Sequence, residues 1–493
     1  MLLETLRREA LERAADRMLL EAELYNSTPA LVGSWTGSWS LRSLRGRLHL
    51  AEPPRPTDIA GKARWWLRAI LAAGYWRVFQ GFPRLHHLNQ LASRMMGDTR
   101  EASRYLIRVE PLQAGMVCAH CAAGRRMAGA CLEPHPDADS GSLDPCEYTQ
   151  RILELRRVKL ATLAAKEPLE RLLYVPLPPG FYRFTLRVER RPTPPRHRRD
   201  RELEELEDKI FGTALGMALF FTGIGRMVTR GYGKLAPAKP IEGDSPLAQA
   251  VRETLKRLQD GDLLSIADEA SHLAADYLEK ADAKPAREQR CLPSYPVFHR
   301  RFIGHTIWRP QTNNIINILK TIDKLTSLKR LARYLSTLTG CGNVHFYYLQ
   351  SILGLPRTKP KRSYIILPQK ALLDRLLLKA ITWPRNKKDI LQQVRYPSPL
   401  MFSPIKSNNI QNGHLQSHYM VHVTYFWYLL APLHIKIPHS HRNRKYTNNI
   451  YRDDFVLAQQ IIEALRSVFN RQPTGYYGCK GNTFLISTLP YTS

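Results

Sequence analysis

The chain has 493 residues, which is enough for two or three domains with sizeable cores. Its formal net charge of +30 predicts a polyanionic partner, because that much charge of one sign otherwise only repels itself. Seven cysteines in so long and basic a chain exclude a disulfide-rich secreted scaffold. No apolar run approaches the eighteen or so residues that span a bilayer, and the N-terminus lacks the apolar core of a signal peptide. We therefore expect a cytoplasmic protein with no membrane partner.

The charge is spread unevenly along the chain. Residues 1–290 carry a net charge of +8 and residues 291–493 a net charge of +22, and asparagine rises from 2 residues to 13 across the same point. We expect a domain boundary there, within residues 284–296. The predicted parts are a first domain over 1–240 with a cysteine-containing insertion at 113–147, a helical connection over 241–290, and a strongly basic second domain over 291–493.

The elements expected in the first part mix helices and strands. In chain order they are an amphipathic helix over 1–23, a strand over 24–32, a hairpin over 42–50, a helix from about 59 to 79, a strand over 100–112, a helix over 148–166, strands over 172–176 and 181–189, and a helix over 202–221. A basic, proline-broken linker over 190–201 precedes the last helix. This order favours a β-α-β-β-α-β unit with insertions.

The later elements are less regular. Residues 243–284 are expected to be helical and acidic. Further helices are predicted over 314–338 and 453–469, and strands over 364–367, 400–405, 419–429 and 483–489. The fold class is therefore predicted to be α+β.

A glycine-rich segment over 222–235 is the most informative motif. It contains Gly223, Gly225, Arg226, Arg230, Gly231, Tyr232, Gly233 and Lys234. Glycines free the backbone to approach a ligand closely, and successive amide groups in such loops bind anions. A helix precedes the segment and a strand follows it, which is the reverse of dinucleotide and Walker loops. An ordinary helix-to-strand turn is the alternative.

A second basic segment lies near the start of the helix predicted from residue 59. It contains Gly61, Lys62, Arg64, Trp65 and Arg68. The two arginines are four residues apart, so they project from one face and repel each other unless an anion lies between them. Trp65 and the adjacent Trp66 cannot face the same way, so at least one should be in the core. A solvated basic helix start is the alternative.

These segments occur in a recognisable order. Residues 27–33, 55–68 and 229–233 together resemble the repeat-associated mysterious protein (RAMP) superfamily of CRISPR systems. They are most similar to the first subunit of the type III-B Cmr effector complexes. A later stretch over 394–402, with Arg395 and Ser398, resembles the strand entry of that family's second domain.

The resemblance implies two tandem ferredoxin-like (RNA-recognition-motif-like) domains with helical and loop insertions. It also implies a noncatalytic RNA-binding subunit that contacts the crRNA 3′ end or target RNA in antiviral defence. The implied partners are crRNA, target RNA and other Cmr or RAMP subunits, with no small-molecule substrate. The RNA-binding residues expected from the motifs are Gly61, Lys62, Arg64, Trp65, Arg68, Gly223, Gly225, Arg226, Arg230, Gly231, Tyr232, Gly233, Lys234, Arg395 and Ser398.

Two chemical alternatives stay open at this point. Cys118, Cys121, Cys131 and Cys146 have enough thiolates for a structural zinc, although their spacing is looser than paired CxxC motifs, and unlinked thiols would explain them equally. No cofactor is otherwise required. Sixteen histidines leave room for a metal-independent CRISPR RNA-processing endoribonuclease. A further alternative is a basic nucleic-acid-binding protein that is unrelated to CRISPR.

Overall fold

The computed structural model describes a little over half of the chain. The described residues are 17–32, 42–44, 48–50, 54–98, 102–113, 116–118, 145–155, 158, 176–191, 200–225, 227–281, 283, 295–310, 312–325, 365–367, 400–411, 414–426 and 434–436. The chain divides into two units. One unit comprises Met1–Pro293, Val297–Asp323 and Met401–Val423, and the other comprises Ser294–Pro296, Lys324–Leu400 and Thr424–Ser493.

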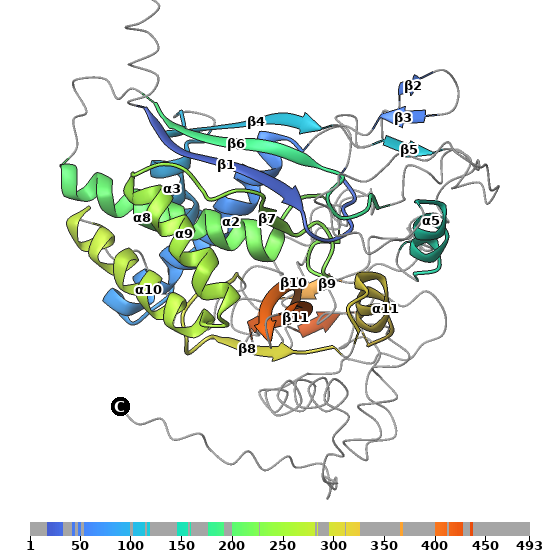
Figure 1. The fold of residues 1–493 in the computed structure, drawn as a ribbon. Coiled ribbons are helices and arrows are strands. Elements are labelled where there is room, and N and C mark those ends of the chain that lie inside the picture. Colours follow the sequence, from blue (N-terminus) through green and yellow to red (C-terminus); the bar gives the residue numbers. More distant parts are fainter. Residues whose placement is uncertain are drawn as a thin grey trace, which may run out of the picture. The chain divides into compact units, whose positions relative to one another are not determined.

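The first unit is built on a four-stranded antiparallel sheet with the order β4-β6-β1-β7 (Figure 1). These strands are β1 (Met18–Asn26), β4 (Tyr105–Gln113), β6 (Arg183–Arg190) and β7 (Leu235–Pro237). Helices α2 (Pro56–Phe79) and α8 (Arg201–Met217) connect β1 to β4 and β6 to β7 along the chain. This confirms the expected β-α-β-β-α-β order of a ferredoxin-like domain and the α+β fold class.

Helices form the second layer and cover one face of the sheet (Figure 1). They are α2, α3 (Leu85–Met96), α8, α9 (Pro246–Gln259) and α10 (Leu263–Lys280). Helix α10 crosses α2 so closely that a Cβ atom on Gly74 would lie 2.5 Å from the Cβ of Ala274. The residues predicted as a helical connection, 241–290, thus contribute two helices that pack against α2 and α8 inside the first unit.

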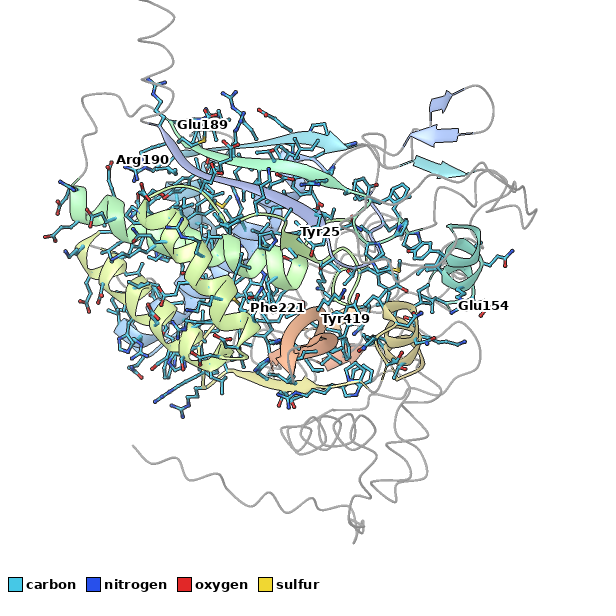
Figure 2. The ribbon with its side chains drawn as sticks, viewed as in Figure 1. Tyr25, Glu154, Glu189, Arg190, Phe221 and Tyr419 are labelled. Carbon is cyan, nitrogen blue, oxygen red and sulfur yellow. The ribbon has the colours of Figure 1, made fainter. Side chains whose placement is uncertain are left out.

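The hydrophobic core lies between the sheet and the helices, where side chains fill the layer (Figure 2). Strand β1 alternates in burial, and Leu20, Ala22 and Leu24 are at most 1% exposed. The prediction of a helix over residues 1–23 was therefore wrong for residues 18–23, because this period-two pattern pairs β1 with β6. Helix α2 begins with proline at its first position and an aspartate in its first turn, both typical of helix starts.

The other face of the sheet carries cross-strand ion pairs. Arg187 on β6 bridges Glu21 on β1 and Glu110 on β4, with nitrogen–oxygen distances of 2.9 Å to each. Arg183 pairs with Glu23 on β1. Strand β4 contains Pro111 beside a shift in register, and β7 ends at a proline. Because opposite charges alternate, this face is close to neutral on a strongly basic chain.

Smaller sheets complete the described part. A three-stranded sheet joins β2 (Arg42–Leu44), β3 (Leu48–Leu50) and β5 (Met116–Cys118), and another has the order β10-β11-β8 with β8 (Ile303–Trp308), β10 (Leu400–Gln411) and β11 (His414–Phe426). The remaining elements of the first unit are α5 (Pro145–Leu153), α11 (Ile315–Leu325) and the π-helix η2 (Ala218–Thr222). In the second unit β9 (Ile365–Leu367) pairs with β12 (His434–Lys436). None of the described helices has the length and apolar character needed to cross a membrane.

A pair of histidines joins β8 to β11. His305 Nε2 and His422 Nδ1 are 3.0 Å apart, and His422 is fully buried. Burial lowers the pKa of His305 to about 4, and burial together with the neighbouring His305 lowers the pKa of His422 to about 3. An unperturbed histidine has a pKa of about 6.5.

We predict that acid destabilises the protein through this pair. Below about pH 6.5 these histidines bind protons in the unfolded chain but stay neutral in the folded protein. The histidine pair therefore contributes its full stabilisation of the folded state above that pH. This contribution is lost as the pH falls toward the folded pKa values. The melting temperature of His422→Leu should therefore depend less steeply on pH between 7 and 4.5 than that of the unmodified chain. The matched control is His272→Gln, at an exposed position on α10. Parallel pH profiles for His422→Leu and the unmodified chain would contradict the prediction.

Candidate nucleic-acid interface

The two basic segments predicted from the sequence lie against each other. Lys62 Nζ donates to Asp58 Oδ2 at 2.9 Å and to the carbonyl oxygen of Gly223 at 2.8 Å. The amide nitrogen of Gly225 donates to the same Asp58 oxygen at 2.9 Å. Burial lowers the pKa of Lys62, and the neighbouring Asp58 partly offsets this effect. These bonds join the start of α2 and the glycine-rich loop in one cluster.

The glycines of the loop permit close contact between chain segments. Gly223, Gly225, Gly231 and Gly233 all have positive φ. A Cβ atom on Gly233 would lie 2.0 Å from the carbonyl oxygen of Ile224, and one on Gly225 would lie 2.3 Å from that of Leu31. Only glycine therefore fits at these two positions, where backbone faces backbone.

The amide groups of the loop donate within the protein. Seven amides have acceptors inside the protein. Five of them donate to backbone carbonyl oxygens: Gly223 to Ala218, Ile224 to Gly233, Arg230 to Met227, Gly231 to Val228, and Gly233 to Pro29. The amide of Gly225 donates to the Asp58 carboxylate, and that of Lys234 to the Thr28 hydroxyl. The expectation that bare amides of this loop form an anion cradle is wrong for these seven groups. Their hydrogen-bonding capacity is already used.

Three predicted RNA-binding side chains lie in the interior. Lys234 is 1% exposed, and its Nζ donates to the carbonyl oxygens of Val228, at 2.7 Å, and of Phe221. Burial, and secondarily Lys62, lowers the pKa of Lys234 well below its usual range. Arg230 is 2% exposed and Tyr232 is fully buried.

Strand β10 covers this part of the loop. The amide of Phe402 donates to the carbonyl oxygen of Thr229 at 3.0 Å, and Ser403 Oγ donates to that of Phe220 at 2.6 Å. The Arg230 guanidinium carbon lies 5.9 Å from the centre of the Phe402 ring, within range of a cation–π contact. Strand β10 is thus attached both to the glycine-rich loop, through Thr229 and Arg230, and to η2, through Phe220.

The predicted side chains of α2 divide between core and surface. Trp66 is fully buried, with its ring centre 5.6 Å from that of Phe221, whereas Trp65 is partly exposed, which confirms that one of the two tryptophans is in the core. Gly61 is exposed. Arg68 Nη1 donates to Asn89 Oδ1 on α3 at 2.9 Å. Burial, followed by the charge of Arg64, lowers the pKa of Arg68.

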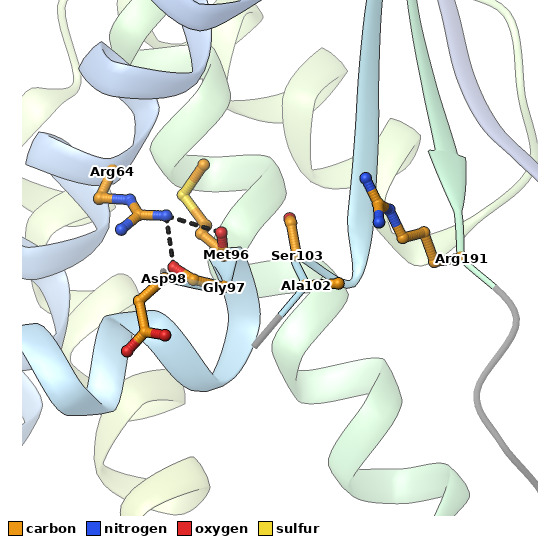
Figure 3. A pocket seen from close by; sticks show the side chains of 7 residues that line it. All are labelled: Arg64, Met96, Gly97, Asp98, Ala102, Ser103 and Arg191. Atoms are coloured by element: carbon orange, nitrogen blue, oxygen red, sulfur yellow. Dashed lines mark hydrogen bonds between the residues drawn. The ribbon is translucent and has the colours of Figure 1, made fainter. Parts of the chain in front are cut away.

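Arg64 lines a pocket that the sequence motifs do not indicate. The other lining residues are Met96, Gly97, Asp98, Ala102, Ser103 and Arg191 (Figure 3). Nη2 of Arg64 donates to the carbonyl oxygens of Met96 and Gly97 at the end of α3, at 2.6 Å each. Arg191 belongs to the basic, proline-broken linker over 190–201, and no spacing rule connects it to Arg64.

Several predicted residues fall outside the described part of the chain. Arg226, Arg395, Ser398, Cys121 and Cys131 belong to this group. Cys118 lies in β5 and Cys146 in α5. Among the residues that the structure describes, no three His, Cys, Asp or Glu side chains are grouped to hold a metal ion. The zinc hypothesis therefore stays a prediction.

Comparison with known proteins gives matches of structure alone. No family model matches the chain, and no curated protein matches it. A type III-B Cmr-beta structure bound to cognate target RNA and AMPPnP in the presence of ssDNA contains a chain with 13% identity and a TM-score of 0.53. That match covers 92% of this chain and 100% of the other. A second Cmr-beta structure, bound to cognate target RNA, gives 13% identity, a TM-score of 0.52, and coverage of 91% and 100%.

A third match is Cmr1 from Pyrococcus furiosus in its apo form. It has 16% identity, with coverage of 89% of this chain and 96% of the other, and its TM-score of 0.40 is too low to support an argument. The first two matches show a shared fold over nearly the whole chain. The structural neighbours are therefore proteins of type III-B Cmr structures, as the sequence resemblance predicted.

We predict that Asp58 holds the helix–loop cluster together. Asp58→Ala removes the shared acceptor of Lys62 and the Gly225 amide, and should lower the free energy of unfolding by about 1–3 kcal/mol in urea titrations. Asp58→Asn keeps an acceptor oxygen and should cost less. Asp260→Ala, at an exposed carboxylate after α9, is the matched control. A stability of Asp58→Ala equal to that of the unmodified chain would refute this role.

Proposed function

We propose that the chain is an RNA-binding structural subunit of a type III-B CRISPR (Cmr) effector complex. The observation that carries this proposal is the likeness of fold, which extends over 92% of this chain and 100% of a chain in a Cmr-beta structure with target RNA. The ordered sequence motifs and the net charge of +30 support it independently. Its partners would be crRNA, target RNA and the other Cmr subunits. The complex would act in antiviral defence in the cytoplasm.

The proposal includes a second ferredoxin-like domain within residues 291–493. The resemblance of the stretch containing Arg395 and Ser398 supports this domain. The strong positive charge after residue 291 is what a second RNA-facing domain needs, because phosphate contacts dominate binding to nucleic acid. We also propose that the four cysteines of the insertion hold a structural zinc, since four thiolates are a sufficient ligand set.

The RNA surface is proposed to lie along α2 and α3. The outer face of the sheet, which stacks bases in RNA-recognition motifs, carries paired opposite charges in the described strands. Three basic residues of the motifs make their contacts inside the protein: Lys62 and Lys234 donate to carbonyl oxygens, and Arg230 packs on Phe402. We propose that they stabilise the conformation of the loop. The partly exposed Arg64 and Arg68, together with Arg226, are the proposed phosphate contacts.

Recovery of bound RNA tests the proposal most directly. The protein is purified under native conditions from the cells that naturally produce it. We expect it to carry short RNAs that are enriched in CRISPR spacer sequences, and we expect other Cmr subunits in the same fractions. RNA without such enrichment would favour a basic nucleic-acid-binding protein unrelated to CRISPR. Absence of any RNA would refute the RNA-binding role itself.

We further propose that the subunit is noncatalytic. The sparse carboxylates of residues 291–493, six in all, argue against a two-metal nuclease in that part. Purified protein incubated with CRISPR repeat RNA in EDTA should leave the RNA intact. Products that end in 2′,3′-cyclic phosphate would instead identify a metal-independent endoribonuclease, in which a base removes the 2′-hydroxyl proton.

A further inference from the structure

A pocket opens between the start of α2, the end of α3 and the ends of β4 and β6. Its volume of about 570 Å³ is within the range of small-ligand sites and can accommodate one nucleotide. Arg64 and Arg191 lie on opposite sides of the pocket as drawn in Figure 3, with Ser103 and Ala102 between them. Asp98 is the acidic residue of the lining, so the side chains around the pocket carry a net positive charge.

Arg64 is held in place by the helix end that it caps. One of its terminal nitrogens donates to two carbonyl oxygens, those of Met96 and Gly97. Cations near a helix C-terminus are also favoured by the helix dipole. A guanidinium has five N–H donors, so several remain for a ligand after these two bonds. The arginine is therefore oriented before any anion binds, which lowers the entropic cost of binding.

Arg191 is fixed at its backbone and exposed at its side chain. Its amide nitrogen donates to the carbonyl oxygen of Arg104 at 2.8 Å. Its side chain is exposed, and Glu204 on α8 pairs instead with Arg104 and Arg190. An exposed cation at the rim of a pocket is accessible to a bound anion.

The neighbouring carboxylates are already neutralised by other arginines. Arg104 pairs with Glu204, at 2.7 Å, and with the buried Glu207. Arg190 pairs with Glu204 at 3.2 Å and with the buried Asp208. These three carboxylates near the start of α8 therefore pair with Arg104 and Arg190 and not with the two arginines of the pocket.

Arg68 lies one helical turn after Arg64 on α2, outside the lining of the pocket. Like charges at this spacing destabilise a helix by a few tenths of a kcal/mol. Arg68 is also partly buried against α3 through Asn89. A bound anion near both arginines would relieve this repulsion.

We infer that the pocket is a phosphate subsite, in which Arg64 and Arg191 contact the sugar–phosphate backbone of one nucleotide of a single-stranded RNA. The inference rests on the proposed RNA-binding function and deepens it, because it identifies where the strand is held and adds Arg191, which no sequence motif contains. Ser103 and Asp98 supply polar side chains to the lining, which can hydrogen-bond ribose hydroxyls, and Met96 and Ala102 are its apolar residues.

The test is the salt dependence of RNA binding by the full-length chain. A fluorescently labelled single-stranded RNA of mixed sequence is titrated at several salt concentrations. Each lost phosphate contact should flatten the slope of log K against log salt concentration by about 0.7. Arg64→Gln and Arg191→Gln should each show this change, and the double variant about twice as much. Arg201→Gln removes the same charge from an exposed position on α8 that pairs with Glu205, and should leave the slope unchanged.

The possible outcomes separate the inference from the function. Arg191→Gln tests the subsite even if Arg64→Gln fails to fold, because the side chain of Arg191 is exposed. RNA binding by the unmodified chain with an unchanged slope in Arg191→Gln would overturn the subsite and leave the proposed function standing. Failure of the unmodified chain to bind RNA would overturn both.

Discussion

One carboxylate oxygen, Oδ2 of Asp58, joins the first helix of the sheet domain to the glycine-rich loop. It accepts from Lys62 Nζ and from the Gly225 amide, while Lys62 reaches the Gly223 carbonyl. Two segments more than 150 residues apart in sequence are thereby fixed to each other. The loop in turn receives β10 through Phe402. Strand β10, far along the chain, thus contacts the same loop that Asp58 fixes to the start of α2.

This arrangement divides the basic residues of the motifs into two groups. Lys234 is buried, and its acceptors among the described residues are carbonyl oxygens, which is consistent with its strongly lowered pKa. Arg64 and Arg191 face a pocket. Positive charge in the sequence therefore serves two purposes, internal construction and ligand attraction, and only burial distinguishes them.

The sequence predicted the β-α-β-β-α-β order, because that order depends on periodicity along the chain. It also indicated both basic segments, although not the contacts through which they meet. It failed for Met18–Glu23, since leucines and glutamates mixed at this spacing fit a helix as well as a strand and only pairing with β6 decides. Nor could it indicate the role of Arg191. That role depends on carboxylates such as Glu207 and Asp208 being used by Arg104 and Arg190, which is a property of the folded neighbourhood.

Both outer strands of the main sheet carry prolines, Pro111 in β4 and Pro237 in β7, and β7 is only three residues long. Proline has no amide hydrogen to give to a new partner strand, and a shift in register next to Pro111 distorts the same edge. Neighbouring proteins therefore cannot readily extend this sheet by adding a strand. Any partner of this sheet domain would therefore meet it mainly through side chains and not through a continued ladder of backbone hydrogen bonds.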